Sequence, residues 1–182
     1  LSADTEIGLP PSHPTLPSLL RSAGYRTALI GKWHMGEGEK FGPLKSGYDR
    51  FYGILKGGSD YFRHSPDNQV DAYRSPLMDG EQPSKDIGYL TELLGHRAEQ
   101  EIAAAGKDRV PLFLSLHFNA PHWPWEGPGD EAESKRLVAG RRSLFDYDGG
   151  SMQTYAAMVT RMDYQIGRVL DALEAGGVAN DT

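Results

Sequence analysis

The sequence predicts an α/β domain built on a largely parallel β-sheet. Two apolar runs, residues 25–31 and 109–118, are the candidate strands, and each follows a stretch with helical spacing. Helix and strand patterns therefore alternate along the 182 residues, which is typical of parallel sheets. Because two strands are too few for a sheet with helices on both faces, we expect the sheet to be incomplete.

The first helix is expected at residues 15–23, with Thr15 as its N-cap. Its apolar residues repeat with the spacing of one helix face, and they are Leu16, Leu19, Leu20 and Ala23. The strand at 25–31 follows. Residues 36–85 then carry many glycine, proline and polar residues with little periodicity, which predicts a long loop.

The second helix is expected to begin at Asp86 and to end near Gly106. The strand at 109–118 is apolar almost throughout, as strands covered on both faces are. Residues 130–150 are charged and irregular, so we expect an excursion there. Ser151 should cap the last helix, which carries a long apolar stripe and ends at a pair of glycines.

Composition excludes several classes of function. The chain has 19 basic and 25 acidic residues, a formal net charge of −6, which argues against binding nucleic acid non-specifically. It has no cysteine, so disulfides, thiolate metal sites and a cysteine nucleophile are ruled out within these residues. No apolar run approaches the roughly 20 residues that a membrane span requires, so no membrane span is expected.

Ionisable residues follow both candidate strands at the point where each strand ends. Lys32 and His34 come after the first strand, and His122 comes after the second. Ligands of open α/β sheets usually bind beyond the carboxyl ends of the strands. If the backbone stays extended, Lys32 and His34 project to one face, and the three side chains would form an anion-binding, proton-transferring site. The alternative is that each is an ordinary solvated loop residue, and His117 is expected to be a hydrogen-bonded core histidine.

The stretch "GYRTALIGKWH" resembles the second signature of the formylglycine-dependent (type I) sulfatases, the arylsulfatase family. That signature has a glycine, an aromatic residue or valine, a serine or threonine two residues later, and then Gly-Lys-aromatic-His. The matching residues here are Gly24, Tyr25, Thr27, Gly31, Lys32, Trp33 and His34. The segments 47–53, 111–125 and 155–177 also resemble sulfatase segments, in the order in which the family has them.

The resemblance implies an alkaline-phosphatase-like three-layer sandwich and a sulfuric ester hydrolase. In that family a hydrated formylglycine attacks sulfur, and a divalent cation, calcium or in second place magnesium, holds the sulfate. By resemblance, Lys32 would bind the sulfate and stabilise transition-state charge. His34 would remove a proton from the formylglycine hydrate, and His122 would bind the sulfate or bridging oxygen and help protonate the leaving alcohol.

The family motif for the nucleophile, Cys/Ser-x-Pro-x-Arg, does not occur here, nor do the paired aspartates that bind the metal. We therefore expect residues 1–182 to be a central fragment of a sulfatase catalytic domain, which alone binds no metal, hydrolyses nothing and self-associates through uncovered apolar faces. Two alternatives stay open: a phosphate or phosphonate monoester hydrolase with the same scaffold, and a non-catalytic sulfatase-like binding domain. The residues expected at the pocket mouth, 60–85 and 126–150, do not identify the sulfate ester. The compartment is also open, although many relatives are exported.

Overall fold

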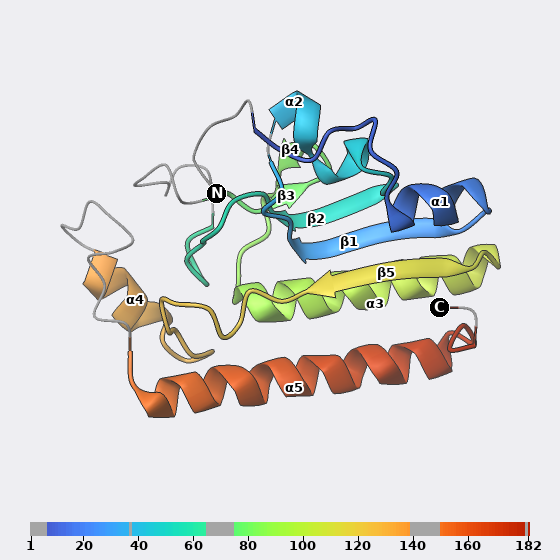
Figure 1. Ribbon diagram of the computed structural model, residues 1–182. Coiled ribbons are helices and arrows are strands. Elements are labelled where there is room, and N and C mark those ends of the chain that lie inside the picture. Colours follow the sequence, from blue (N-terminus) through green and yellow to red (C-terminus); the bar gives the residue numbers. More distant parts are fainter. Residues whose placement is uncertain (1–6, 37, 65–74, 139–149, 181) are drawn as a thin grey trace.

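A five-stranded sheet with the order β4-β3-β2-β1-β5 forms the centre of the computed structural model (Figure 1). β1 (Arg26–Lys32) lies between β2 (Arg50–Ile54) and β5 (Leu112–His117) and is parallel to both. β3 (Met78–Asp79) and β4 (Gln82–Pro83) extend the sheet beyond β2 as a short antiparallel hairpin. The α/β fold with a largely parallel sheet is therefore confirmed. The described residues are 7–36, 38–64, 75–138, 150–180 and 182.

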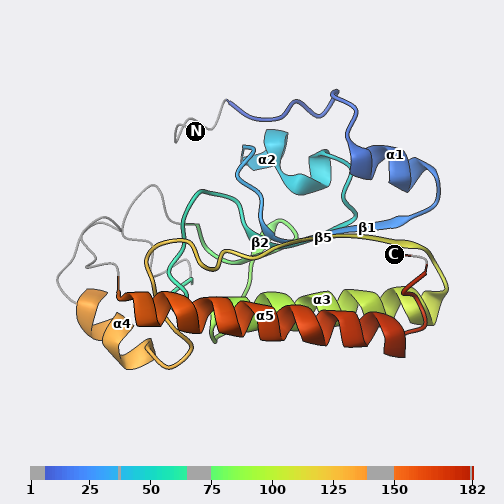
Figure 2. The ribbon, with the colours of Figure 1, turned by 60° about the horizontal axis from the view of Figure 1, so that its bottom comes forward.

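Helices cover both faces of the sheet (Figures 1 and 2). One face carries α1 (Leu16–Ser22), α2 (Gly38–Phe41) and the short 3-10 helix η1 (Pro43–Lys45). The other face carries two long helices, α3 (Leu90–Asp108) and α5 (Met152–Ala175), which lie side by side. α4 (Glu131–Val138) lies past the carboxyl end of β5.

The alternation of side chains along the parallel strands divides the core into two parts. Leu29 of β1 and Phe51 of β2 pack with Trp33 and Tyr48 in one buried cluster. The next residue of each strand, Ile30 and Tyr52, belongs to a second cluster, which includes residues of α3 and α5. Successive residues of a strand point to opposite faces, so a continuously apolar strand is buried on both sides.

The first and last helices agree with the sequence in position but are less buried than their apolar residues suggest. Thr15 caps α1, since its side chain accepts a hydrogen bond from the Ser18 amide. Yet Leu16 and Leu19 are 58% and 62% exposed. Ser151 caps α5 as expected. Helical periodicity shows that a face is apolar, but only the tertiary structure shows what covers it.

The second helix begins four residues later than expected, at Leu90 rather than Asp86. Asp86 does not cap the helix, because its carboxylate accepts hydrogen bonds from the hydroxyls of Tyr52, at 2.7 Å, and Ser84, at 2.9 Å. Gly88, with φ of +147°, redirects the chain before the helix starts. The hydrogen bond to Tyr52, a residue of β2, thus holds Asp86 outside the helix that the local pattern predicted to begin there.

The expectation of a long loop at 36–85 was wrong, because β2 is a central strand and β3 and β4 extend the sheet from it. β2 has only five residues, one of them glycine, and is held by pairing with β1, so local pattern gave little signal. The irregular excursion expected at 130–150 was also wrong in part, since α4 occupies its first half. Residues 65–74 and 139–149 lie outside the described residues.

Candidate functional site at the carboxyl end of the sheet

Two glycines allow the three parallel strands to converge where the candidate site begins. Gly31 of β1 is paired with Gly53 of β2 on one side and with His117 of β5 on the other. A Cβ on Gly31 would lie 1.9 Å from the His117 carbonyl oxygen, and one on Gly53 would lie 1.9 Å from the Gly31 carbonyl oxygen. No side chain fits at either position. Gly31 therefore brings β5 close to the strand end that presents Lys32.

The backbone leaves the extended conformation immediately after Lys32. The amide of Trp33 donates to the Ile54 carbonyl and that of His34 donates to the Leu55 carbonyl, each at 2.9 Å. His34 has φ of +58°, so the expectation of an extended backbone through this residue was wrong. The left-handed turn carries the imidazole to the loop after β2, where a Cβ on Gly57 would lie 3.0 Å from His34 Nε2.

The indole of Trp33 anchors the turn between the two ionisable residues. It is only 8% exposed, and its Nε1–H donates to the Phe41 carbonyl at 2.9 Å. Trp33 therefore packs in the core between two side chains that are only half-buried. A buried anchor of this kind fixes where Lys32 and His34 leave the sheet.

Electrostatic interactions connect the three residues that the sequence singled out. Burial lowers the pKa of Lys32. The pKa of His34 is lowered first by burial and then by the positive charges of Lys32 and His122, among others. β1 and β5 are parallel and are paired as far as Gly31 and His117. Lys32 and His34, at the end of β1, and the loop that carries His122, after β5, therefore follow strand ends at the same edge of the sheet.

His122 lies in the loop that follows β5 and is exposed. Its amide donates to the Asn119 carbonyl at 2.8 Å, which forms a tight turn. Its Nδ1 lies 2.6 Å from the Trp123 carbonyl oxygen. A carbonyl can only accept, so Nδ1 carries a proton and Nε2 is the atom that can exchange protons with a ligand.

Sequence reasoning misplaced one residue of this region. His117 was expected in the core but is exposed at the end of β5, where its Nδ1 donates to the Lys32 carbonyl at 3.1 Å. The expectation of a hydrogen bond was right, and that of burial was wrong, because His117 is the last residue of β5, which lies at the edge of the sheet. No periodicity signal marks that point.

Sequence reasoning also assigned no role to Tyr61 and Glu126, which join the loops around the site. Tyr61 is fully buried, its amide donates to Glu126 Oε2 at 2.9 Å, and its hydroxyl donates to the His122 carbonyl at 3.0 Å. The cluster of aromatic residues at 41–62 was the available signal, but it gave no indication of which tyrosine reaches the site.

The residues described by the structure do not offer a site for the divalent cation that the family resemblance implies. Within them, no group of three histidine, aspartate or glutamate side chains could hold a metal ion. In the same part of the chain, no helix is both long and apolar enough to cross a membrane.

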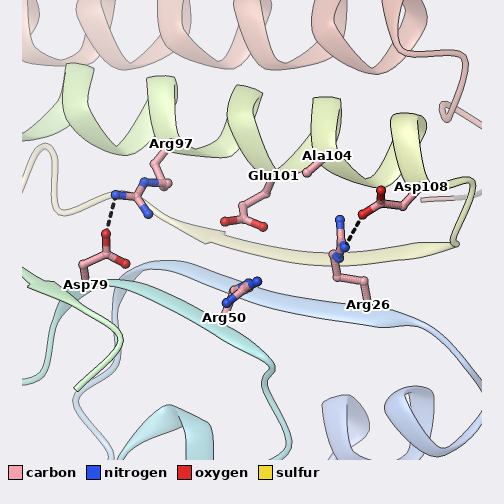
Figure 3. Close-up of a pocket in the computed structure, with 7 residues that line it drawn as sticks. All are labelled: Arg26, Arg50, Asp79, Arg97, Glu101, Ala104 and Asp108. Atoms are coloured by element: carbon pink, nitrogen blue, oxygen red, sulfur yellow. Dashed lines mark hydrogen bonds and ion pairs between the residues drawn. The ribbon is translucent and has the colours of Figure 1, made fainter. Parts of the chain in front are cut away.

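A cavity of about 300 Å³ lies elsewhere, between α3 and the sheet (Figure 3). Arg26 and Arg50, which line it, are the first residues of β1 and β2, so this cavity is toward the amino ends of these strands. Arg26 pairs with Asp108 at 2.6 Å, and Arg97 pairs with Asp79 at 2.7 Å. Paired charges of both signs make this cavity a structural ion network, distinct from the candidate site.

In open α/β sheets, ligands usually bind beyond the carboxyl ends of the parallel strands, and that is where Lys32, His34 and His122 follow β1 and β5. The comparisons with known proteins are more specific. The Sulfatase family model matches residues 2–182, and the chain belongs to the sulfatase family.

Curated relatives and solved structures agree with this assignment. The chain is 32% identical to mouse arylsulfatase J over 178 residues, which cover 96% of this chain and 28% of the relative. It is 27% identical to the arylsulfatase of Klebsiella aerogenes, covering 97% of this chain and 47% of the relative. A crystal structure of Ps i-CgsB in complex with k-i-k-neocarrahexaose matches with a TM-score of 0.79 and 28% identity, covering 99% of this chain and 40% of that chain. The chain thus spans less than half the length of these proteins.

Proposed function

We propose that the complete protein hydrolyses sulfate monoesters and that Lys32, His34 and His122 form the part of its sulfate site that these residues supply. Membership of the sulfatase family supports the reaction class. The observation that carries the assignment of residues is the parallel pairing of β1 and β5, after whose carboxyl ends Lys32, His34 and His122 follow. Three basic groups at that edge of a parallel sheet are suited to a tetrahedral anion.

Lys32 is proposed to bind the sulfate oxygens. Burial alone disfavours its charged form, and a bound anion would favour that form again. The attraction is strong because the ammonium is half-buried, where water screens it less than on an open surface. As negative charge moves toward the leaving oxygen during cleavage of the S–O bond, a fixed cation at the sulfate stabilises the transition state.

The two histidines are proposed to move protons in opposite directions. The pKa of His34 is lowered from 6.5, so its imidazole is mostly neutral at pH 7 and can accept a proton from the nucleophile. His122 keeps a proton on Nδ1, and in its imidazolium form its Nε2–H can donate to the alcohol oxygen that leaves. A general base and a general acid that act together would give the hydrolysis a bell-shaped pH dependence.

The nucleophile and the metal ligands are proposed to come from segments of the complete protein outside residues 1–182. This proposal agrees with the absence of a Cys/Ser-x-Pro-x-Arg sequence and of cysteine in these residues. We accordingly propose that the 182-residue chain by itself has no hydrolytic activity.

A sulfated carbohydrate is the substrate class that we propose. The structure with a TM-score of 0.79 is a complex with a neocarrahexaose, and mouse N-acetylgalactosamine-6-sulfatase is 29% identical over 96% of this chain. An aryl sulfate is the second candidate, because arylsulfatase J and the Klebsiella arylsulfatase are also among the relatives. A sulfated oligosaccharide and 4-nitrophenyl sulfate should therefore be assayed together.

The decisive test compares sulfate and phosphonate esters of the same alcohol with the full-length protein. We expect faster turnover of the sulfate ester and a loss of about a hundredfold or more in kcat/KM for Lys32→Ala and for His122→Ala, as removing a transition-state contact typically causes. Faster turnover of the phosphonate would establish the rival hydrolase. Absence of turnover, together with absence of Cys/Ser-x-Pro-x-Arg upstream in the gene, would favour a binding domain.

A further inference from the structure

The buried tyrosine Tyr61 connects the loop after β2 to the loop that carries His122. Tyr61 is 0% exposed, although it lies on an irregular segment. Its hydroxyl donates to the His122 carbonyl at 3.0 Å, and its amide donates to the Glu126 carboxylate at 2.9 Å. One residue thus holds the loop after β5 at two points, on either side of Trp123–Trp125.

The Tyr61 side chain is a rigid hydrogen-bond donor. Its ring stacks on that of Tyr89, with centroids 5.5 Å apart and planes at 25°, so it has little freedom to rotate. Burial is the main cause that raises its pKa, and the phenol therefore stays protonated over the whole range in which an enzyme of this kind would be assayed. The hydroxyl of Tyr89 donates to the Glu126 carbonyl at 2.7 Å, which fixes the same loop from the same side.

His122 depends on this support because its own side chain is exposed. The contact that orients its imidazole is the bond from Nδ1 to the carbonyl of the next residue, Trp123. That hydrogen bond fixes the orientation of the imidazole relative to the local backbone, but it does not fix the position of this backbone relative to β1. The hydrogen bond from the Tyr61 hydroxyl to the carbonyl of His122 itself fixes that position.

We propose that Tyr61 is a positioning residue, which holds His122 at the distance from Lys32 and His34 that proton transfer to the leaving oxygen requires. The inference rests on the role proposed above for His122. Small displacements of a general acid are costly, because the proton must be delivered within hydrogen-bond distance of the leaving oxygen. Tyr61 itself touches neither substrate nor nucleophile in this scheme.

The test is the variant Tyr61→Phe in the full-length protein, with Tyr48→Phe as the matched control. Both tyrosines are buried, and each substitution removes one phenol hydroxyl and keeps the ring. The Tyr48 hydroxyl is 2.9 Å from Ser115 Oγ in β5, so its loss does not release the loop of His122. We expect kcat to fall about tenfold in Tyr61→Phe with KM changed less than twofold, and both parameters to stay within twofold in Tyr48→Phe.

A second readout separates positioning from general loss of stability. The pH profile of kcat in Tyr61→Phe should shift in the limb that His122→Ala alters, and the imidazole NMR signals of His122 should move or broaden while those of His34 stay in place. Unchanged kcat in Tyr61→Phe, or an equal loss in Tyr48→Phe, would overturn the inference. If His122→Ala keeps wild-type activity, the role proposed for His122 is wrong, and the inference about Tyr61 is wrong with it. If His122→Ala is inactive while Tyr61→Phe has normal activity, only the inference about Tyr61 is wrong.

Discussion

Replacing Gly31 by alanine tests whether the fold depends on the close approach of β5 to β1 at this residue. Gly31 has φ of +119°, a conformation that costs a residue with a side chain about 1–3 kcal/mol. The new Cβ would also lie 1.9 Å from the carbonyl oxygen of His117, a backbone atom that cannot move alone. The two strands would have to separate where Lys32 is presented.

Two other glycines separate the contributions to that cost. Gly24 has φ of +91° and has no heavy atom within 4 Å of the position of a Cβ, so Gly24→Ala reports backbone strain alone. Gly167 lies within α5 with the same open surroundings, and Gly167→Ala should stabilise the chain by roughly 0.5–1 kcal/mol. We expect Gly24→Ala to lose about 1–2 kcal/mol and Gly31→Ala to lose about 4 kcal/mol or more, since steric overlap is added to strain.

The assay is urea unfolding of the 182-residue chain at low protein concentration, followed by circular dichroism. A loss of about 4 kcal/mol is a large part of the roughly 5–15 kcal/mol by which proteins of this size are stable, so Gly31→Ala should unfold at much lower urea concentration. Equal midpoints for Gly31→Ala and Gly24→Ala would refute the reasoning, because the overlap with His117 would then carry no free energy.

Three further predictions concern charge and surface. Lys32→Met should raise the pKa of His34 toward its ordinary value, because it removes a nearby positive charge; a histidine NMR titration measures this, and an unchanged pKa would show that the two residues do not share a site. Burial lowers the pKa of His64 in the folded state. The contribution of neutral His64 to stability is therefore complete above the unfolded-state pKa of 6.5 and is lost as the pH falls through the folded-state pKa. The midpoint of urea unfolding should decline from pH 7.5 to pH 4.5, and it should decline less steeply in His64→Gln. The 182-residue chain should self-associate through the exposed apolar residues of α5, and replacing Ile166 and Leu170 by glutamate should shift its sedimentation toward the monomer, whereas a wild-type chain that is monomeric at high concentration would contradict this.

The sequence predicted the fold class and the regular elements that have strong local signals. The helices at α1 and α5 carry caps and apolar repeats, and β1 and β5 are apolar almost throughout, although β5 is only half-buried over most of its length. β2 could not be predicted in the same way. Its five residues include Gly53, and what makes them a strand is the ladder to β1, whose residues lie more than 20 positions earlier.

The sequence by itself determined which residues could form a sulfate site, because the spacing of Gly31, Lys32 and His34 is a family signature and His122 follows the next apolar run. Only the tertiary structure decided how the segments that carry these residues are held. The left-handed turn at His34, the exposure of His117 and the bond from Tyr61 to His122 all depend on partners far away in the chain. The spacing of residues along the chain determines which chemical groups are available, whereas the backbone conformation, burial and orientation of each residue depend on the segments that pack around it.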